Sequence, residues 1–273
     1  MRIAKVVALI LTIVIGLMVS GCATKVITGS ADVDKNSFGA KKKFAVVSIA
    51  SLKTFQGEQG LMQLFKSNDN IPGVNTQPII NKLRPRIIGA LGKSKHFTLM
   101  PENAVFSNKA YKSLEEDEKV VKVLFMSEAI NVADSYKYVS AENEKKYAKL
   151  ASDLGVDGVI GITVSFSVSS GGGALNAVGL SLGRKNYSAM ASVSAVAYNK
   201  NGAVIWKDST VKEADPGDKK AIILVDTTGV TDTNFEKLHP SAVEIGEKAM
   251  GVLLARLDDT MTGKEASKIQ SVK

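Results

Sequence analysis

The chain has 273 residues, of which 45% are apolar and 23% are charged, and its formal net charge is +8. This composition is typical of a globular protein and excludes a largely disordered one. Aromatic residues are sparse and do not alternate with basic ones, which argues against a nucleic-acid partner. The basic excess suits either the anionic surfaces of a cell envelope or an ordinary solvated, lysine-rich surface.

The first twenty-two residues have the pattern of a secretory signal. Arg2 and Lys5 precede an apolar run at residues 6–19, which is too short to span a bilayer comfortably. Two small residues at 20–21 and the chain's only cysteine, Cys22, follow. This end resembles a bacterial lipobox. The alternative is an ordinary signal peptide, or a membrane anchor, with an unrelated cysteine.

The lipobox resemblance implies a lipoprotein whose signal peptide, residues 1–21, is removed and whose Cys22 carries acyl chains such as palmitate. Ala23 stands where an aspartate favours the inner membrane, so we expect a lipid anchor in the outer membrane, with the protein facing the periplasm. Removal of Arg2 and Lys5 lowers the formal net charge from +8 to +6. Because the anchor uses the only cysteine, no disulfide within the chain is expected.

We expect the lipidated cysteine and a flexible tether in residues 22–40, which lack periodicity and are rich in small and polar types. A single α/β domain, residues 41–262, and a polar tail, residues 263–273, follow. An apolar run at residues 44–49 predicts an interior strand. The lysines at 41–43 before it either contact phospholipid headgroups or flank the hydrophobic strand against aggregation.

Residues 76–92 predict a helix, because their apolar positions recur at helical spacing. Pro85 is expected to kink or divide this helix, and Gly92 to end it. A second strand is expected at residues 96–100.

Two short helices are expected at residues 102–114 and 115–126. The acidic cluster at 115–118 would then lie near the start of the second helix, where acidic residues favour the helix dipole, so we interpret it as structural and not as a metal site. Whether residues 102–139 belong to the core or form a separate lid stays open. A firmer helix is expected at 142–154.

The clearest pattern in the chain lies at residues 160–169, where apolar and hydroxylated or glycine positions alternate and predict a half-buried strand. Residues 187–198 predict a second long strand with alanines on one face. Asn201-Gly202 predicts a hairpin turn into residues 203–206, and a last helix is expected to begin at Pro240. The order predicts an α/β sandwich: a mixed β-sheet with antiparallel hairpins, covered mainly on one face by helices.

Several segments in this order resemble one group of envelope proteins. They are KKKFAVVSIAS (41–51), HFTLMP (96–101), YAKLASDLGVDGVIGITVSFSV (147–168) and VSAVAYNKNGAVIWKDSTV (193–211). The group contains periplasmic lipoproteins related to the curli secretion channel CsgG, the penicillin-binding-protein activator LpoB and the N-terminal domain of TolB. Its helix-to-strand motif is matched by Leu154, Gly155, Asp157 and Gly161. The resemblance implies a CsgG/LpoB-like fold and a role in binding or assembly, without enzymatic activity and without any binding residue that carries over.

The glycine-rich segment 171–183 connects the two long strands. Val178, Leu180 and Leu182 alternate within it, and exposed apolar groups are costly unless something covers them. These three residues are candidates for contact with a partner or the membrane, but a flexible connection folded back on its own domain is the interpretation that we favour. A membrane-spanning hairpin needs lipid-facing strands of about 9–11 residues, and the alanine-rich second strand is a poor candidate.

The same segment contains the literal motif G-x-S-x-G around Ser181, and Asp208 or Asp226 and then His239 follow in hydrolase order. A nucleophile elbow needs a helix directly after the serine, whereas a strand is expected here. His96 and His239 are not spaced as ligands and no thiol is free, so no metal or cofactor is expected.

We therefore expect a non-enzymatic lipoprotein that binds or assembles with an unidentified envelope protein through protein–protein contacts, with self-association as one option. The alternative is a CsgG-like outer-membrane secretion pore subunit. A third option is a serine hydrolase that uses Ser181.

Overall fold

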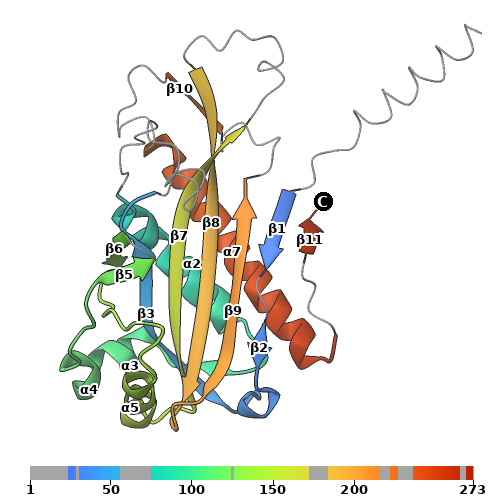
Figure 1. Cartoon of the computed structure of the whole chain (residues 1–273). Helices are drawn as coiled ribbons and strands as arrows, with labels where there is room; N and C mark the ends of the chain where they lie inside the picture. Colours follow the sequence, from blue (N-terminus) through green and yellow to red (C-terminus); the bar gives the residue numbers. More distant parts are fainter. Residues whose placement is uncertain are drawn as a thin grey trace, which may run out of the picture.

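The computed structural model describes residues 24–28, 31–55, 75–123, 126–171, 184–214, 222–226, 236–264 and 269–272. Figure 1 shows a long twisted sheet with helices packed on it. The main strands are β1 (Thr24–Thr28), β3 (Lys43–Leu52), β5 (Val120–Val123), β6 (Met126–Val132), β7 (Gly158–Gly171), β8 (Arg184–Asn199), β9 (Val204–Glu213) and β11 (Ile269–Val272). Shorter strands are β2 (Asp32–Val33), β4 (Thr98–Leu99) and β10 (Ile222–Asp226).

The helices are α2 (Gln77–Gly92), α3 (Glu102–Ser107), α4 (Lys109–Lys112), α5 (Glu144–Leu154) and α7 (His239–Met261), with 3₁₀ turns η1 (Lys35–Ser37) and η4 (Glu236–Leu238). Within the described ranges the strands form one sheet, ordered β11-β1-β9-β8-β7-β3-β6-β5, with β10, β2 and β4 attached to β8, β9 and β3. The β3–β7 pair is parallel, whereas β7, β8 and β9 are antiparallel. The predicted α/β sandwich is confirmed.

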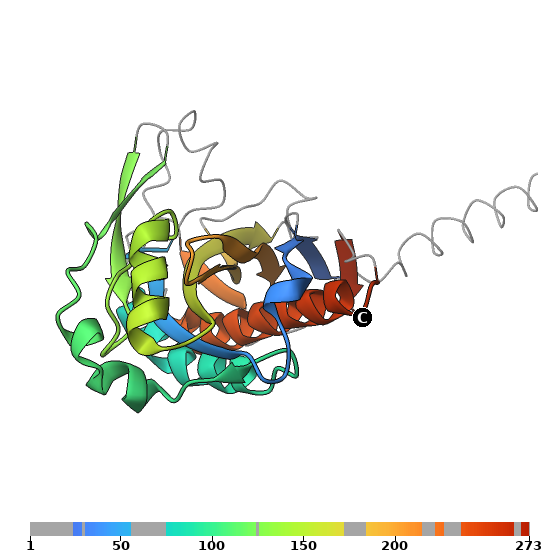
Figure 2. The ribbon, with the colours of Figure 1, turned by 90° about the horizontal axis from the view of Figure 1, so that it is seen from below.

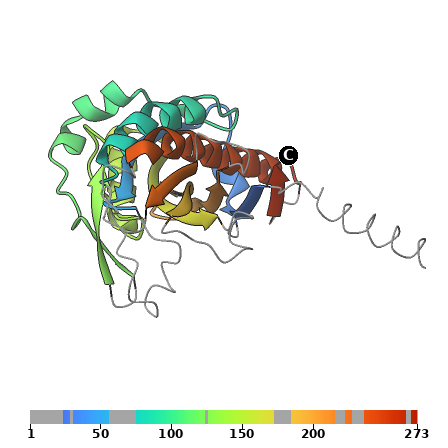
Figure 3. The same ribbon diagram turned by 90° about the horizontal axis from the view of Figure 1, so that it is seen from above.

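Two helices, α2 and α7, cover one face of the sheet, and Figures 2 and 3 show them side by side on it. The apolar positions of β7 point into this layer, as the alternation predicts. They are Ile160, Ile162, Val164, Phe166 and Val168, and all are buried in one cluster with the apolar faces of both helices. The apolar stripe of each helix therefore packs against the apolar face of the longest strands.

The second face is covered only over one end of the sheet. There α5, α3 and α4 pack over the starts of β3 and β7 in a smaller cluster that contains Val159, Tyr147 and Tyr198. Further along, β7 and β8 present half-buried hydroxyl groups in register, with Thr163 opposite Ser194 and Ser165 opposite Ser192. The expectation that helices lie mainly on one face therefore holds.

Residues 115–126 do not form the expected helix, and this prediction was wrong. The chain has no regular secondary structure at 114–119 and then forms the hairpin strands β5 and β6, whose connecting residues 124–125 lie outside the described ranges. β6 pairs with β3 through Ala50 and Val132, and Ile130 packs with Ala50 and Tyr138. Non-local pairing and burial thus override the local preference. Val105 and Tyr111 are buried, so residues 102–139 contribute to the core.

The ranges expected as tether and tail contain strands. β1 pairs with β9 and with β11, and β2 pairs with β9. Sequence periodicity does not reveal such short strands, because their hydrogen bonds come from distant parts of the chain. The domain boundaries themselves stay a prediction.

A buried ion pair joins α7 to β9. The guanidinium of Arg256 donates from Nε to Asp208 Oδ2 at 2.8 Å and from Nη2 to Asp208 Oδ1 at 3.1 Å. The two side chains are only 2% and 0% exposed. A paired geometry of this kind satisfies both charges, whereas removal of one partner leaves the other buried and uncompensated.

Replacing Arg256 by methionine should lower the free energy of unfolding by about 3–5 kcal/mol, because it leaves the Asp208 carboxylate buried. Adding Asp208→Asn to Arg256→Met should recover part of this loss. Urea denaturation of the purified protein, followed by circular dichroism, measures both values. An Arg256→Met loss below about 1 kcal/mol would show that the pair is not structurally required.

Gly161 has no room for a side chain, because a Cβ there would lie 2.0 Å from the Tyr147 hydroxyl oxygen. Gly161→Ala should therefore destabilise the fold by about 1–3 kcal/mol through overpacking. Gly89, inside α2, is a matched control, since nothing lies within 4 Å of the position that a Cβ would take there. Gly89→Ala should raise stability by about 0.5–1 kcal/mol. Thermal unfolding of the two variants should shift in opposite directions.

Candidate functional site

One end of the sheet gathers lysines from distant parts of the sequence. The starts of β3 and β7 and the end of β8 meet there, since Phe44 pairs with Gly158 and Gly158 with Asn199. The segment before β3 joins the same end, because Gly39 donates to the carbonyl of His96. We call this surface the basic end. It contains Lys35, Lys41, Lys42, Lys43, Lys95 and Lys200, together with the carboxylates of Asp34, Asp157 and Asp258.

Asp157 is the central carboxylate of the basic end. It accepts hydrogen bonds from the Lys43 backbone N–H at 2.9 Å and from Lys42 Nζ at 3.3 Å. The backbone bond first, and then Lys42 and the nearby Lys200, hold the pKa of this carboxyl below its ordinary value. Among the described residues, Lys35, Lys41 and Lys200 are in no ion pair. Positive charge at this end is therefore only partly compensated.

A groove between α2 and α7 opens beside the basic end. Its volume is about 400 Å³. The lining residues are Ala90, Lys93, Ser94, Lys95, His96, Glu247, Gly251, Leu254, Ala255 and Asp258. We call this feature the helix groove. Small residues form much of its wall and cations cluster at one end, which suits a narrow polypeptide segment that carries negative charge.

The cationic end of the helix groove is organised around Asp258. His96 Nε2 lies 2.9 Å and Lys95 Nζ 3.2 Å from Asp258 Oδ1. The contact with His96, followed by that with Lys95, lowers the pKa of the Asp258 carboxyl. Lys93, the next cation along the wall, is exposed and is in no ion pair among the described residues. An incoming carboxylate would find an uncompensated ammonium there.

Sequence reasoning missed this site for a physical reason. Lys93 and Lys95 follow the end of α2, Lys200 lies in the β8–β9 turn, and Lys41 precedes β3. Such positions look like ordinary polar flanks when each is taken alone. Only the tertiary fold brings them to one end of the molecule, and a cluster of lysines around element ends is the one signal the sequence offers.

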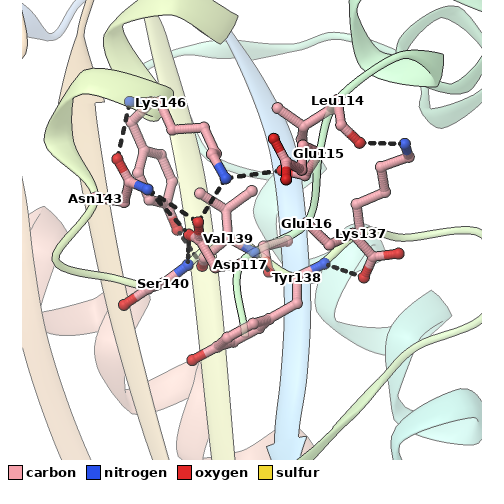
Figure 4. A network of polar contacts seen from close by, with 12 residues as sticks. Leu114, Glu115, Glu116, Asp117, Lys137, Tyr138, Val139, Ser140, Asn143 and Lys146 are labelled. Carbon is pink, nitrogen blue, oxygen red and sulfur yellow. Dashed lines mark hydrogen bonds and ion pairs between the residues drawn. The ribbon is translucent and has the colours of Figure 1, made fainter. Parts of the chain in front are cut away.

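A second feature, the acidic cluster at 115–118, has a structural role. Residues 133–143 form an irregular segment with turns at 134–135 and 141–142, which we call the strap. Figure 4 shows the side chains of Glu116 and Asp117 accepting hydrogen bonds from the backbone of the strap, and Lys146 of α5 bound to Asp117. Glu116 accepts from the Tyr138 N–H at 3.0 Å, and Asp117 accepts from the Ser140 N–H at 2.8 Å. Lys146 pairs with Asp117 and also donates to the Glu115 carbonyl.

The strap therefore explains these acidic residues without a metal. The prediction of a structural role is in line with the contacts, but the helix-dipole reason is wrong, since no helix begins there. Burial acts to raise the pKa of Asp117, but Lys146 and the Ser140 N–H outweigh this effect and the pKa is lowered. The pKa of Glu116 is lowered in the same way, because the Tyr138 N–H and Lys119 outweigh its burial. No group of three or more His, Cys, Asp or Glu side chains in the described ranges is placed to hold a metal ion.

The hydrolase candidates do not come together where the structure describes them. Asp208 is bonded to Arg256, which follows His239 by seventeen positions on α7, about 25 Å at 1.5 Å per residue. Asp208 is thus too far away to orient His239. Asp226 lies in β10 opposite Arg184. Burial lowers the pKa of His239, and its Nε2 has no hydrogen-bond partner among the described residues. Ser181 lies outside them.

The other predicted site residues also lie outside the described ranges. These are Cys22 and the apolar residues Val178, Leu180 and Leu182. Their flanks are described: β7 and β8 pair as far as Gly171 and Asn186, so the connection leaves from the end of this hairpin. Among the described helices, none combines the length and the apolar content that a bilayer crossing requires.

Comparison with known proteins adds little. No family model matches the sequence, and no curated protein matches it. Among solved structures, the chain is similar to the LpoB C-terminal domain from Salmonella enterica, with 13% sequence identity, a TM-score of 0.30, and coverage of 63% of this chain and 83% of that chain. That domain belongs to the group which the sequence resembles. A likeness at this level carries no statement about the function of this chain.

The strap makes stability depend on pH. Because the pKa values of Glu116 and Asp117 are lowered by folding, these carboxylates contribute stability above about pH 4, and this contribution is lost as the pH falls through their folded pKa values. Asp117→Asn should cost about 1–3 kcal/mol at pH 7, and the difference from wild type should shrink toward pH 2. Urea unfolding at both pH values measures this. Glu115, whose side chain is exposed, is the control, and Glu115→Gln should change the free energy of unfolding at pH 7 by less than about 0.5 kcal/mol.

Proposed function

We propose that this chain is a lipid-anchored periplasmic lipoprotein that binds an acidic segment of another envelope protein through the basic end and the helix groove. The observation that carries this proposal is a set of lysines beside a groove of about 400 Å³. Lys35, Lys41, Lys93 and Lys200 belong to this set and are in no ion pair among the residues that the structure describes. Complementary charge speeds association and selects partners. The lipobox-like sequence that ends at Cys22 supports the proposed lipid anchor and the periplasmic location.

We propose a binding role for this end, without catalysis. Within the described ranges the basic end offers ammonium groups, backbone groups and one histidine–aspartate contact. The Ser37 hydroxyl donates to Asp34 Oδ2 at 2.7 Å, but this bond closes the local η1 turn on an exposed surface. The distance between Asp208 and His239 disfavours the hydrolase alternative. That alternative predicts labelling of Ser181 by a fluorophosphonate probe.

We also propose that Val178, Leu180 and Leu182 contact the membrane or a partner at the end of the β7–β8 hairpin. The long pairing of these two strands supports a connection that projects from the sheet. The secretion-pore alternative uses the same segment differently. It predicts rings in detergent and conductance in planar bilayers, whereas the binding module predicts neither.

The anchor is tested by metabolic labelling with an alkyne analogue of palmitate. Wild-type protein should incorporate label and fractionate with membranes, whereas Cys22→Ser should lose both properties and keep the wild-type circular dichroism spectrum. Membrane association of an unlabelled Cys22→Ser protein would contradict a lipid anchor at this residue.

The binding site is tested by photo-crosslinking in cells. A crosslinking amino acid at Gly251, in the helix groove, should capture a discrete protein, and one at Lys82, on exposed α2 surface outside it, should not. Lys93→Glu with Lys95→Glu should reduce capture at least tenfold. Lys53→Glu with Lys237→Glu, an equal change of charge elsewhere, should leave it within twofold. Equal capture by both double variants would count against the site.

A further inference from the structure

The strand register places the start of β1 and the basic end at opposite ends of the sheet. Val26 of β1 lies opposite Lys212, Lys212 opposite Ala191, and Ala191 opposite Phe166. Thr24 is two residues nearer the open end of the β7–β8 hairpin, on the row of Val168. Figure 1 shows β1 beside the upper part of β9 and the β8–β9 turn at the bottom.

The separation between these ends follows from strand geometry. The row of Val168 and the row of Gly158, where the basic end begins, are ten residues apart on β7. At about 3.3 Å per residue this is roughly 33 Å along the sheet. The basic end therefore lies about one domain length away from the start of β1.

The proposed anchor lies close to the start of β1. Cys22 is two positions before Thr24, and two residues of chain span at most about 7 Å. If acyl chains on Cys22 enter a bilayer, the open end of the hairpin is held at the membrane. A tether of eighteen residues would let the domain turn freely, but β1 pairs with β9 and β11 and removes most of that length.

We infer that the basic end faces away from the anchoring membrane and recognises an acidic protein surface, not the headgroups of that membrane. This inference rests on the proposed lipid anchor. Electrostatic attraction between exposed charges is screened over about 8 Å at physiological ionic strength. A separation of roughly 33 Å is several times this length, so anionic headgroups at the anchor exert little pull on Lys41 or Lys200.

Opposite charge on a protein is the complementary partner for this end. Lys35, Lys41 and Lys200 are exposed and in no ion pair among the described residues, and Asp157 is already shared between Lys42 and the Lys43 N–H. The helix groove continues this surface through Lys95 and adds volume for a chain segment. A protein segment rich in Asp or Glu satisfies both features.

The orientation is tested with full-length lipidated protein in liposomes that contain a headgroup-labelled acceptor lipid. Because acylation consumes the only native thiol, a cysteine at Asn201 or at Glu213 takes a donor dye selectively. Asn201 lies in the turn at the basic end, and Glu213 lies opposite Met190 near the other end. Energy transfer from Asn201 should be at most half of that from Glu213. Equal or greater transfer from Asn201 would overturn the inference.

Two arms separate the remaining explanations. Acyl labelling is measured on the same sample, and its absence would refute the proposed anchor and with it the orientation. Liposomes with added phosphatidylglycerol test for headgroup recognition. If the lysines bind lipid, transfer from Asn201 should rise toward that from Glu213, which would overturn the inference; an unchanged ratio supports it.

Poly-L-glutamate serves as the probe for an acidic protein segment. It should bind the liposome-anchored protein and change the emission of a dye at Asn201, but not of one at Glu213. Lys35→Glu, Lys41→Glu and Lys200→Glu together should weaken binding at least tenfold. The matched variant Lys53→Glu, Lys82→Glu and Lys237→Glu should change it less than twofold. Equal weakening in both would show attraction to overall charge alone and would overturn the assignment of the basic end.

Discussion

Apolar and hydroxyl-bearing residues alternate along β7, and the resulting apolar face of this strand constrains the rest of the structure. Because its apolar residues all point one way, α2 and α7 must lie on that side, and the ion pair between Arg256 and Asp208 fixes α7 against β9. The opposite face has a close backbone approach at Gly161, where Tyr147 of α5 fits. Each helix is thus positioned by the strand at the centre, and the ends of the sheet are left free to carry loops and charge.

The sequence predicts what local pattern determines. β7, α5 with its left-handed Gly155, the turn at Gly202 and α7 after Pro240 all follow from periodicity and turn chemistry. The β5–β6 hairpin does not, since pairing with β3 overrides acidic residues that suit a helix start. β1 and β11 are missed because their pairing partners lie in distant parts of the chain, which local periodicity does not reveal. The basic end was not predictable either, because its lysines come from residues 35 to 200 and meet only in the folded chain.

The positions of the lysines bear on how the basic end would lie relative to the proposed lipid anchor. A net positive protein at an anionic membrane invites the idea that its lysines bind lipid. The register instead puts Lys41 and Lys200, which are in no ion pair among the described residues, at the end remote from β1, beside the helix groove. Lys41–Lys43 first suggest either headgroup contact or protection of a hydrophobic strand. Their position supports a third role, in which Lys42 and the Lys43 N–H hold Asp157 while Lys41 stays available to a partner.

The position of β1 also has a mechanical consequence. If the chain is pulled through an acyl anchor at Cys22, the load enters β1, which lies between β9 and β11 in antiparallel pairing. Force along the strand then acts in shear on both ladders at once, so their hydrogen bonds share the load and do not open one after another. Of the two neighbours, β9 belongs to the core of the sheet, and it passes the load to Asp208, Arg256 and α7. Under such a load, tension would be carried into the buried ion pair between Arg256 and Asp208.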